Sequence, residues 1–140
     1  MSEASFQNVF VGSWTYRSWL NDTNLSTPPN QLLFGSGTIK ITEAEMQILR
    51  GTIGGEGWQL ELFGSRSYGN PMTVRFQGKG SVGGSEWIYD YIGYLVPEWP
   101  NGVNQKTAMV GSIVRTIPHP SGSGTAPAGV TASWYAVKQA

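Results

Sequence analysis

Apolar and polar residues alternate with a period of two along most of this chain, which is the pattern of β-strands that bury one face. The clearest example surrounds residue 74, where apolar side chains point one way and polar side chains the other. This run shows which positions point inward and which point outward, and it guides the same assignment in the neighbouring strands. The predicted inward set is Met72, Val74 and Phe76, and the predicted outward set is Arg75, Gln77 and Lys79.

Eight strand-like runs can be marked, each bounded by turn residues. The helix-like stretch 42–50 has Thr42 followed by Glu45, as in a capping box, but it leads directly into glycines between two strands. A hairpin that turns at 43–45 is therefore favoured there. The runs are Val9–Asn21, Gln31–Ile41, Met46–Ile53, Trp58–Phe63, Met72–Gly80, Glu86–Val96, Gln105–Ile117 and Gly129–Lys138.

Short links between most of these runs favour antiparallel pairing of sequence neighbours. Eight such strands in 140 residues predict one all-β domain over 1–140, an eight-stranded up-and-down barrel. A sandwich of two four-stranded sheets is the alternative, because the period of two does not distinguish a sandwich from a barrel. Glycines inside the strands would permit the strong coiling of a small barrel. They are Gly12, Gly35, Gly37, Gly51, Gly64, Gly78, Gly93 and Gly111.

The first strand carries Gly12-Ser13-Trp14. A Gly-x-Trp motif in this place resembles the start of calycin barrels, the lipocalins and avidins. The resemblance implies that Trp14 closes one end of the barrel and that a basic residue from the last strand packs across its ring. Lys138 matches that position, with Arg115 as the second choice. The resemblance also implies a ligand-carrying role without naming a ligand.

Tyrosines on the predicted inner face suggest what the lumen does. Buried phenols need hydrogen-bond partners, so these residues either bond within a packed core or face a wet cavity. An eight-stranded barrel can hold one small ligand. We predict that a small hydrophobic or aromatic molecule binds there, and a structural or interaction protein with a filled core is a remaining alternative. The predicted ligand contacts are Trp14, Tyr16, Trp58, Trp87, Tyr89 and Tyr91.

Asp90 interrupts the apolar run 87–96, where a carboxylate needs a partner. Arg17, Arg75 and Arg115 are candidates because all three fall within predicted strands. Inside the lumen, an Asp–Arg pair would anchor a polar ligand. With a tyrosine, it could instead serve a small cyclase or isomerase that acts on a hydrophobic substrate. On the outside it would be a structural or interface salt bridge, which is the favoured reading.

The runs 86–96 and 105–117 are apolar on both faces. A barrel strand needs only one apolar face, so the outer surface there is predicted to be covered. A homo-oligomer, a dimer or a tetramer, is the favoured explanation. The alternative is that the loop holding Trp99 folds back over this surface.

The amino-acid composition narrows the range of possible functions. Nine Lys and Arg balance nine Asp and Glu, so the chain lacks the basic surface of a nucleic-acid binder. There is no cysteine, and the single histidine, His119, is interpreted as a solvated loop residue, so neither metal nor cofactor is expected. The formal GxGxxG match at 78–83 precedes a strand and is read as a turn.

The expected location is cytoplasmic. The stretch 1–10 shows no signal-peptide pattern, and no apolar run approaches the length of a membrane span. The absence of cysteine fits a reducing compartment.

Overall fold

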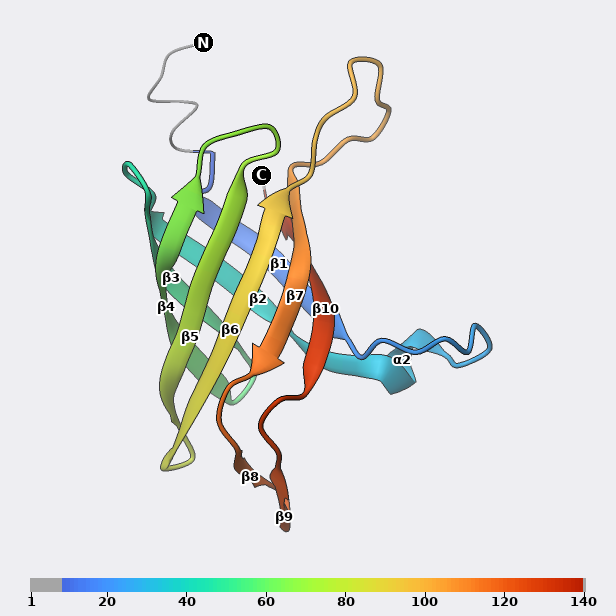
Figure 1. The fold of residues 1–140 in the computed structure, drawn as a ribbon, viewed down its shortest axis with the longest axis vertical. Helices are drawn as coiled ribbons and strands as arrows, with labels where there is room; N and C mark the ends of the chain where they lie inside the picture. Colours follow the sequence, from blue (N-terminus) through green and yellow to red (C-terminus); the bar gives the residue numbers. More distant parts are fainter. Residues whose placement is uncertain (1–8, 140) are drawn as a thin grey trace.

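The computed structural model describes residues 9–139 and forms a closed eight-stranded antiparallel barrel (Figure 1). Around the barrel the strands follow the order β1-β10-β7-β6-β5-β4-β3-β2, and β2 pairs back with β1. The predicted barrel is thus confirmed over the sandwich. The strands are β1 Gly12–Trp19, β2 Leu33–Glu43, β3 Ile48–Gly55, β4 Trp58–Ser67, β5 Thr73–Val82, β6 Ser85–Leu95, β7 Ala108–Arg115 and β10 Thr131–Lys138.

Two links contain structure that the sequence pattern did not predict. The β1–β2 link ends in α2, a single helical turn over Pro29–Leu32. The β7–β10 link, predicted to be a mobile loop, forms a hairpin of β8 (His119–Ser121) and β9 (Gly124–Ala126). The stretch 42–50 is a hairpin as predicted, with its turn one to two residues later than expected, at 44–47.

Side chains alternate in and out as the period of two predicted. On β5, Val74 and Phe76 are buried while Arg75 and Gln77 are exposed. Most of the remaining core comes from the inward positions of the other seven barrel strands, and Phe10, Ala44 and Met72 join it from the adjoining links. The prediction that there is no signal peptide was based on residues 1–10, and most of these lie outside the described residues. Within 9–139, no helix has the length and apolar character required to cross a lipid bilayer.

Trp14 seals the end of the barrel where β1 begins. Its indole is fully buried, and Nε1 donates a hydrogen bond to the carbonyl of Phe10 at 2.9 Å. The Lys138 ammonium lies 5.8 Å from the centre of the Trp14 ring and donates to the Val9 carbonyl at 2.7 Å. The predicted cation over this tryptophan is therefore Lys138 and not Arg115.

A buried arginine, which sequence reasoning missed, fills the same end. Arg66 is almost fully buried and donates through Nε to the Met46 carbonyl at 2.9 Å and through Nη2 to the Tyr68 hydroxyl at 3.1 Å. Its guanidinium also lies over the rings of Phe10 and Tyr68. Because Met46 has a left-handed backbone at φ 55°, this contact fixes an unusual turn between β2 and β3.

Replacing Lys138 with Met should destabilise the barrel. The change removes a cation–π contact and a charged hydrogen bond, which together are worth about 1–3 kcal/mol. Urea unfolding measures the loss, with Lys40→Met as the matched control because Lys40 is exposed on β2. Equal unfolding free energies for the two variants would contradict this account of the seal.

Candidate functional site

A cavity of about 200 Å³ opens at the end of the barrel opposite Trp14. Residues from five strands line it, and aromatic side chains dominate its wall. Five of the six predicted ligand contacts lie in this lining, whereas Trp14 is not among them and seals the far end. The lining residues are Tyr16, Phe34, Gly35, Trp58, Trp87, Tyr89, Tyr91 and Ile113.

Gly35 helps to keep this space open. A Cβ at Gly35 would lie 3.5 Å from Ser18 Oγ and 3.7 Å from the Tyr16 ring, which are ordinary contact distances. At Gly93, by contrast, a Cβ would lie 2.8 Å from the Trp134 ring, so the neighbouring indole already occupies that space. The space beside Gly35 is therefore open, whereas the space beside Gly93 is filled by Trp134.

Tyrosine hydroxyls lie at the inner end of the cavity. The Tyr16 hydroxyl donates to Ser18 Oγ at 2.8 Å, and Ser18 in turn donates to the Gly35 carbonyl at 3.4 Å. Burial raises the pKa of Tyr16 to about 12 and raises the pKa of Tyr91 well above its usual value. Both phenols therefore stay protonated at neutral pH and can act as hydrogen-bond donors.

His119 forms part of the rim of the cavity and is not the solvated loop residue that was expected. It is only 6% exposed, and its ring stacks on Trp87 with centroids 3.9 Å apart. Its Nε2 lies 2.7 Å from the Tyr89 hydroxyl, and its Nδ1 lies 3.0 Å from the Pro120 carbonyl. A carbonyl can only accept, so Nδ1 carries the hydrogen and Nε2 accepts from Tyr89.

The expectation for His119 failed because the β8–β9 hairpin packs against β6. The composition of the segment 118–128 indicated flexibility and contained no signal for that contact. Thirty positions separate the two partners Tyr89 and His119 in sequence.

Arg115 completes the rim. Its Nε donates to the Tyr89 hydroxyl at 3.0 Å, and its Nη1 donates to the Pro127 carbonyl at 3.2 Å. The guanidinium carbon lies 5.0 Å from the centre of the Phe34 ring, which is part of the cavity lining. Across residues 9–139, the carboxylates within 4.0 Å of a basic side chain belong to other pairs, so Arg115 contributes an unneutralised positive charge at the rim.

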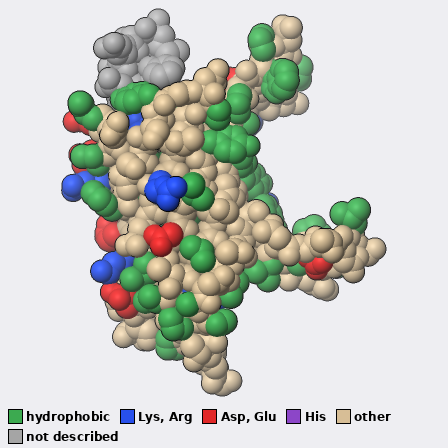
Figure 2. All heavy atoms as spheres, in the orientation of Figure 1, with side chains coloured by type: hydrophobic (Ala, Val, Ile, Leu, Met, Phe, Trp, Pro, Cys, Tyr) green, Lys and Arg blue, Asp and Glu red, His purple; other side chains and the backbone are tan. Residues whose placement is uncertain are grey.

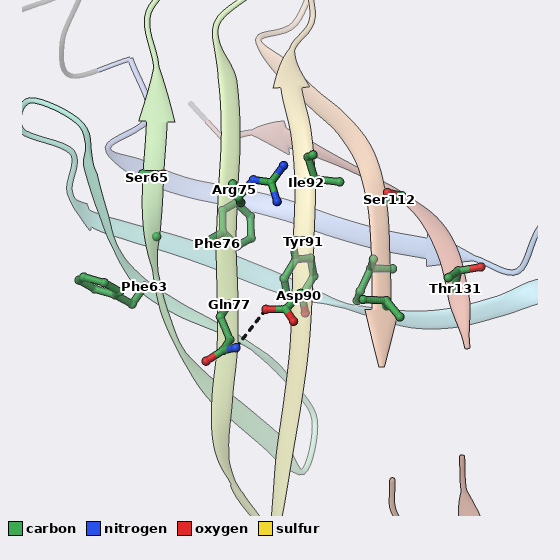
Figure 3. Close-up of a pocket in the computed structure, with 13 residues that line it drawn as sticks. Phe63, Ser65, Arg75, Phe76, Gln77, Asp90, Tyr91, Ile92, Ser112 and Thr131 are labelled. Atoms are coloured by element: carbon green, nitrogen blue, oxygen red, sulfur yellow. Dashed lines mark hydrogen bonds between the residues drawn. The ribbon is translucent and has the colours of Figure 1, made fainter. Parts of the chain in front are cut away.

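Asp90 lies on the outer surface of the barrel, as in the favoured interpretation, and not in the lumen. Figure 3 shows its carboxylate directed toward Gln77 on the neighbouring strand. It accepts hydrogen bonds from Gln77 Nε2 at 3.0 Å and from Thr116 Oγ1 at 2.7 Å, and from none of the three predicted arginines. Arg17 lies instead over the Tyr135 ring, also on the outside.

Two larger hollows lie on this outer surface, over strands β4 to β7, with volumes of about 580 and 670 Å³. Both are open to solvent, and exposed positions such as Arg75 and Ile92 line them. The lumenal cavity is smaller, but it alone of the three gathers a predominantly aromatic lining with convergent hydroxyls. It is therefore the candidate site.

Comparison with known proteins finds no matching family model, no matching curated protein and no matching solved structure. Among the residues that the structure describes, no three His, Cys, Asp or Glu side chains come together in a way that could hold a metal ion.

Tyr16 should make stability depend on alkaline pH. Its pKa in the folded barrel, about 12, lies above the ordinary value of 10.0, so its contribution is complete below pH 10 and is lost as pH rises from about 10 to about 12. This difference corresponds to about 2–3 kcal/mol. Urea unfolding across this window should show a smaller loss for Tyr16→Phe than for the wild type, and parallel curves would contradict the assignment.

His119→Ala should destabilise the rim by about 2–4 kcal/mol, because it removes the ring stacked on Trp87 and leaves the Tyr89 hydroxyl without its acceptor. His119→Phe keeps the stack and should recover part of the loss. Thermal unfolding measures both variants, with Thr125→Ala on the exposed part of the same hairpin as the control. A His119→Ala variant as stable as the control would show that the hairpin contact is unimportant.

Proposed function

We propose that this protein binds a small, mostly apolar ring-shaped molecule at the open end of its lumen. The observation that carries the proposal is the cavity of about 200 Å³ lined by Trp58, Trp87, Phe34 and tyrosines. A concave, aromatic site with a few convergent polar groups is the usual form of a small-molecule pocket. A cavity of this size also argues against a completely filled core.

The size of the cavity limits the ligand. An apolar cavity of about 150 Å³ holds a benzene molecule. The cavity here is somewhat larger, so it suits one ring with substituents or two fused rings. Aromatic faces on several sides favour a planar ligand that stacks between them.

Polar groups at the two ends define how the ligand would lie. At the inner end the Tyr16 hydroxyl already donates its hydrogen to Ser18 and can only accept from a ligand, whereas the protonated Tyr91 hydroxyl can donate to an acceptor. At the outer end, the positive charge of Arg115 favours a carboxylate or another anionic group. The Tyr89 hydroxyl is already engaged by His119 and Arg115, so it contributes mainly its ring.

A calycin-like relationship fits this function. It is supported by the closed eight-stranded barrel and by Gly12, Trp14 and Lys138 at the sealed end. The enzymatic alternative loses its proposed acid, because Asp90 lies outside the lumen. The cytoplasmic location stays a prediction from the absence of cysteine.

Calorimetric titration with naphthalene and 2-naphthoate tests the proposal. Both should bind and raise the melting temperature, since a ligand at about 100 times its Kd adds about 2.7 kcal/mol. Trp58→Ala should weaken binding by at least about tenfold, equivalent to about 1.4 kcal/mol. Trp99→Ala is the matched control, because Trp99 lies on an exposed loop away from the cavity.

Arg115→Gln should remove the preference for 2-naphthoate over naphthalene while leaving naphthalene binding nearly unchanged. Failure of both probes to bind the wild type, or equal losses in the two tryptophan variants, would contradict the lumenal site. Equal binding of the two probes by the wild type would contradict the role of Arg115.

A further inference from the structure

The outer surface formed by β7, β10 and the 92–95 end of β6 carries only uncharged side chains, many of them apolar, although it faces solvent. Tyr94, Val110 and Tyr135 lie side by side in register across the three strands. Ile92 lies in the adjacent row and is 44% exposed. We call this surface the neutral face.

The neutral face lacks formal charge. The outward positions of β7 and β10 hold Ala, Val, Ser, Thr and Tyr, with no Lys, Arg, Asp or Glu. The two acidic side chains of β6 lie outside this face, nearer the start of the strand: Glu86 lies 3.7 Å from Lys79, and Asp90 accepts hydrogen bonds from Gln77 and Thr116. On the opposite side of the barrel, outward positions hold charges such as Arg50 and Glu61, and Figure 2 shows charged side chains gathered along that edge of the view.

Two segments project from the barrel on either side of the neutral face (Figure 1). One is the β1–β2 link, where Leu25 is 100% exposed. The other is the β6–β7 link, where Trp99 is 77% exposed, so this loop does not fold back over the face as the sequence alternative proposed. Figure 2 shows the outline of the molecule hollowed between the two projections, with hydrophobic side chains along the hollow.

We propose that the neutral face is the interface of a homodimer, with a second copy of this chain seated between the two projections. An uncharged surface is best matched by another uncharged surface. The same face of a second copy is uncharged, so no like charges would face each other in the dimer. Charges of both signs border the face, Arg17 on β1 and Asp22, Glu98 and Lys106 on the projections. Such a border suits the polar rim of a two-fold interface.

The size of the surface sets what the dimer must bury. Three strands, β6, β7 and β10, cover roughly 14 by 27 Å, or about 400 Å², from the usual strand spacing and rise. A specific interface buries ~800 Å² on each partner. The projections with Leu25 and Trp99 must therefore also contact the second copy.

Sedimentation equilibrium of the wild type and of a matched pair of Ile→Lys variants tests this proposal. The wild type should have twice the mass of the 15.2 kDa chain at about 50 µM. Ile92→Lys places like charges opposite each other and should raise the dimer Kd by at least about 100-fold. Ile48→Lys, 38% exposed on the opposite side on β3, should leave the dimer intact.

A tetramer that Ile92→Lys splits into dimers would also support the interface. A monomeric wild type, or an Ile92→Lys variant that associates like Ile48→Lys, would overturn it. Circular dichroism checks that each variant folds, and Val110→Lys replaces Ile92→Lys if the latter does not. The proposal is independent of the lumenal ligand, since Trp58→Ala should bind the probes at least about tenfold more weakly and yet remain dimeric.

Discussion

The pairing of β1 with β10 is the constraint on which the rest of the structure depends. It joins the first and last strands of the barrel, so that each of the eight barrel strands is paired on both sides. Trp14 and Lys138 are direct partners in this pairing, so the register that closes the sheet also brings the ammonium to the indole. A slip of one residue would turn one of them out of the barrel, which ties closure and sealing to a single register.

Sealing one end determines where the cavity can lie. Near Trp14, the side chains of Phe10 and Arg66 leave little space. In the middle, Trp134 contacts the rings of Tyr16, Phe76 and Tyr91 and takes the room that Gly93 leaves. Space remains at the opposite end, where Gly35 lies beside Tyr16. The candidate site is therefore the part of the lumen that these side chains do not fill.

Most of the barrel and five cavity residues could be predicted from the sequence because both follow from strand alternation. The phase around Val74 placed Tyr89 and Tyr91 inside without knowledge of any contact. The rim could not be predicted, because His119 acts through a hairpin that packs on a strand 30 residues earlier. Arg66 was missed for the same reason, since its partner Met46 belongs to a turn 20 residues away.

Asp90 helps to fix the register of β6, a role that its position in an apolar run does not reveal. With apolar residues on both faces of β6 and β7, the hydrophobic pattern alone would tolerate a slipped register. Two features remove that freedom: Trp134 fits only against a glycine, Gly93, and Asp90 bonds to Gln77 on β5 and Thr116 beyond β7. A carboxylate turned inward by a slip would lose both partners in an apolar lumen. Asp90 thus helps to fix which face of β6 lines the cavity and which lies on the outside of the barrel.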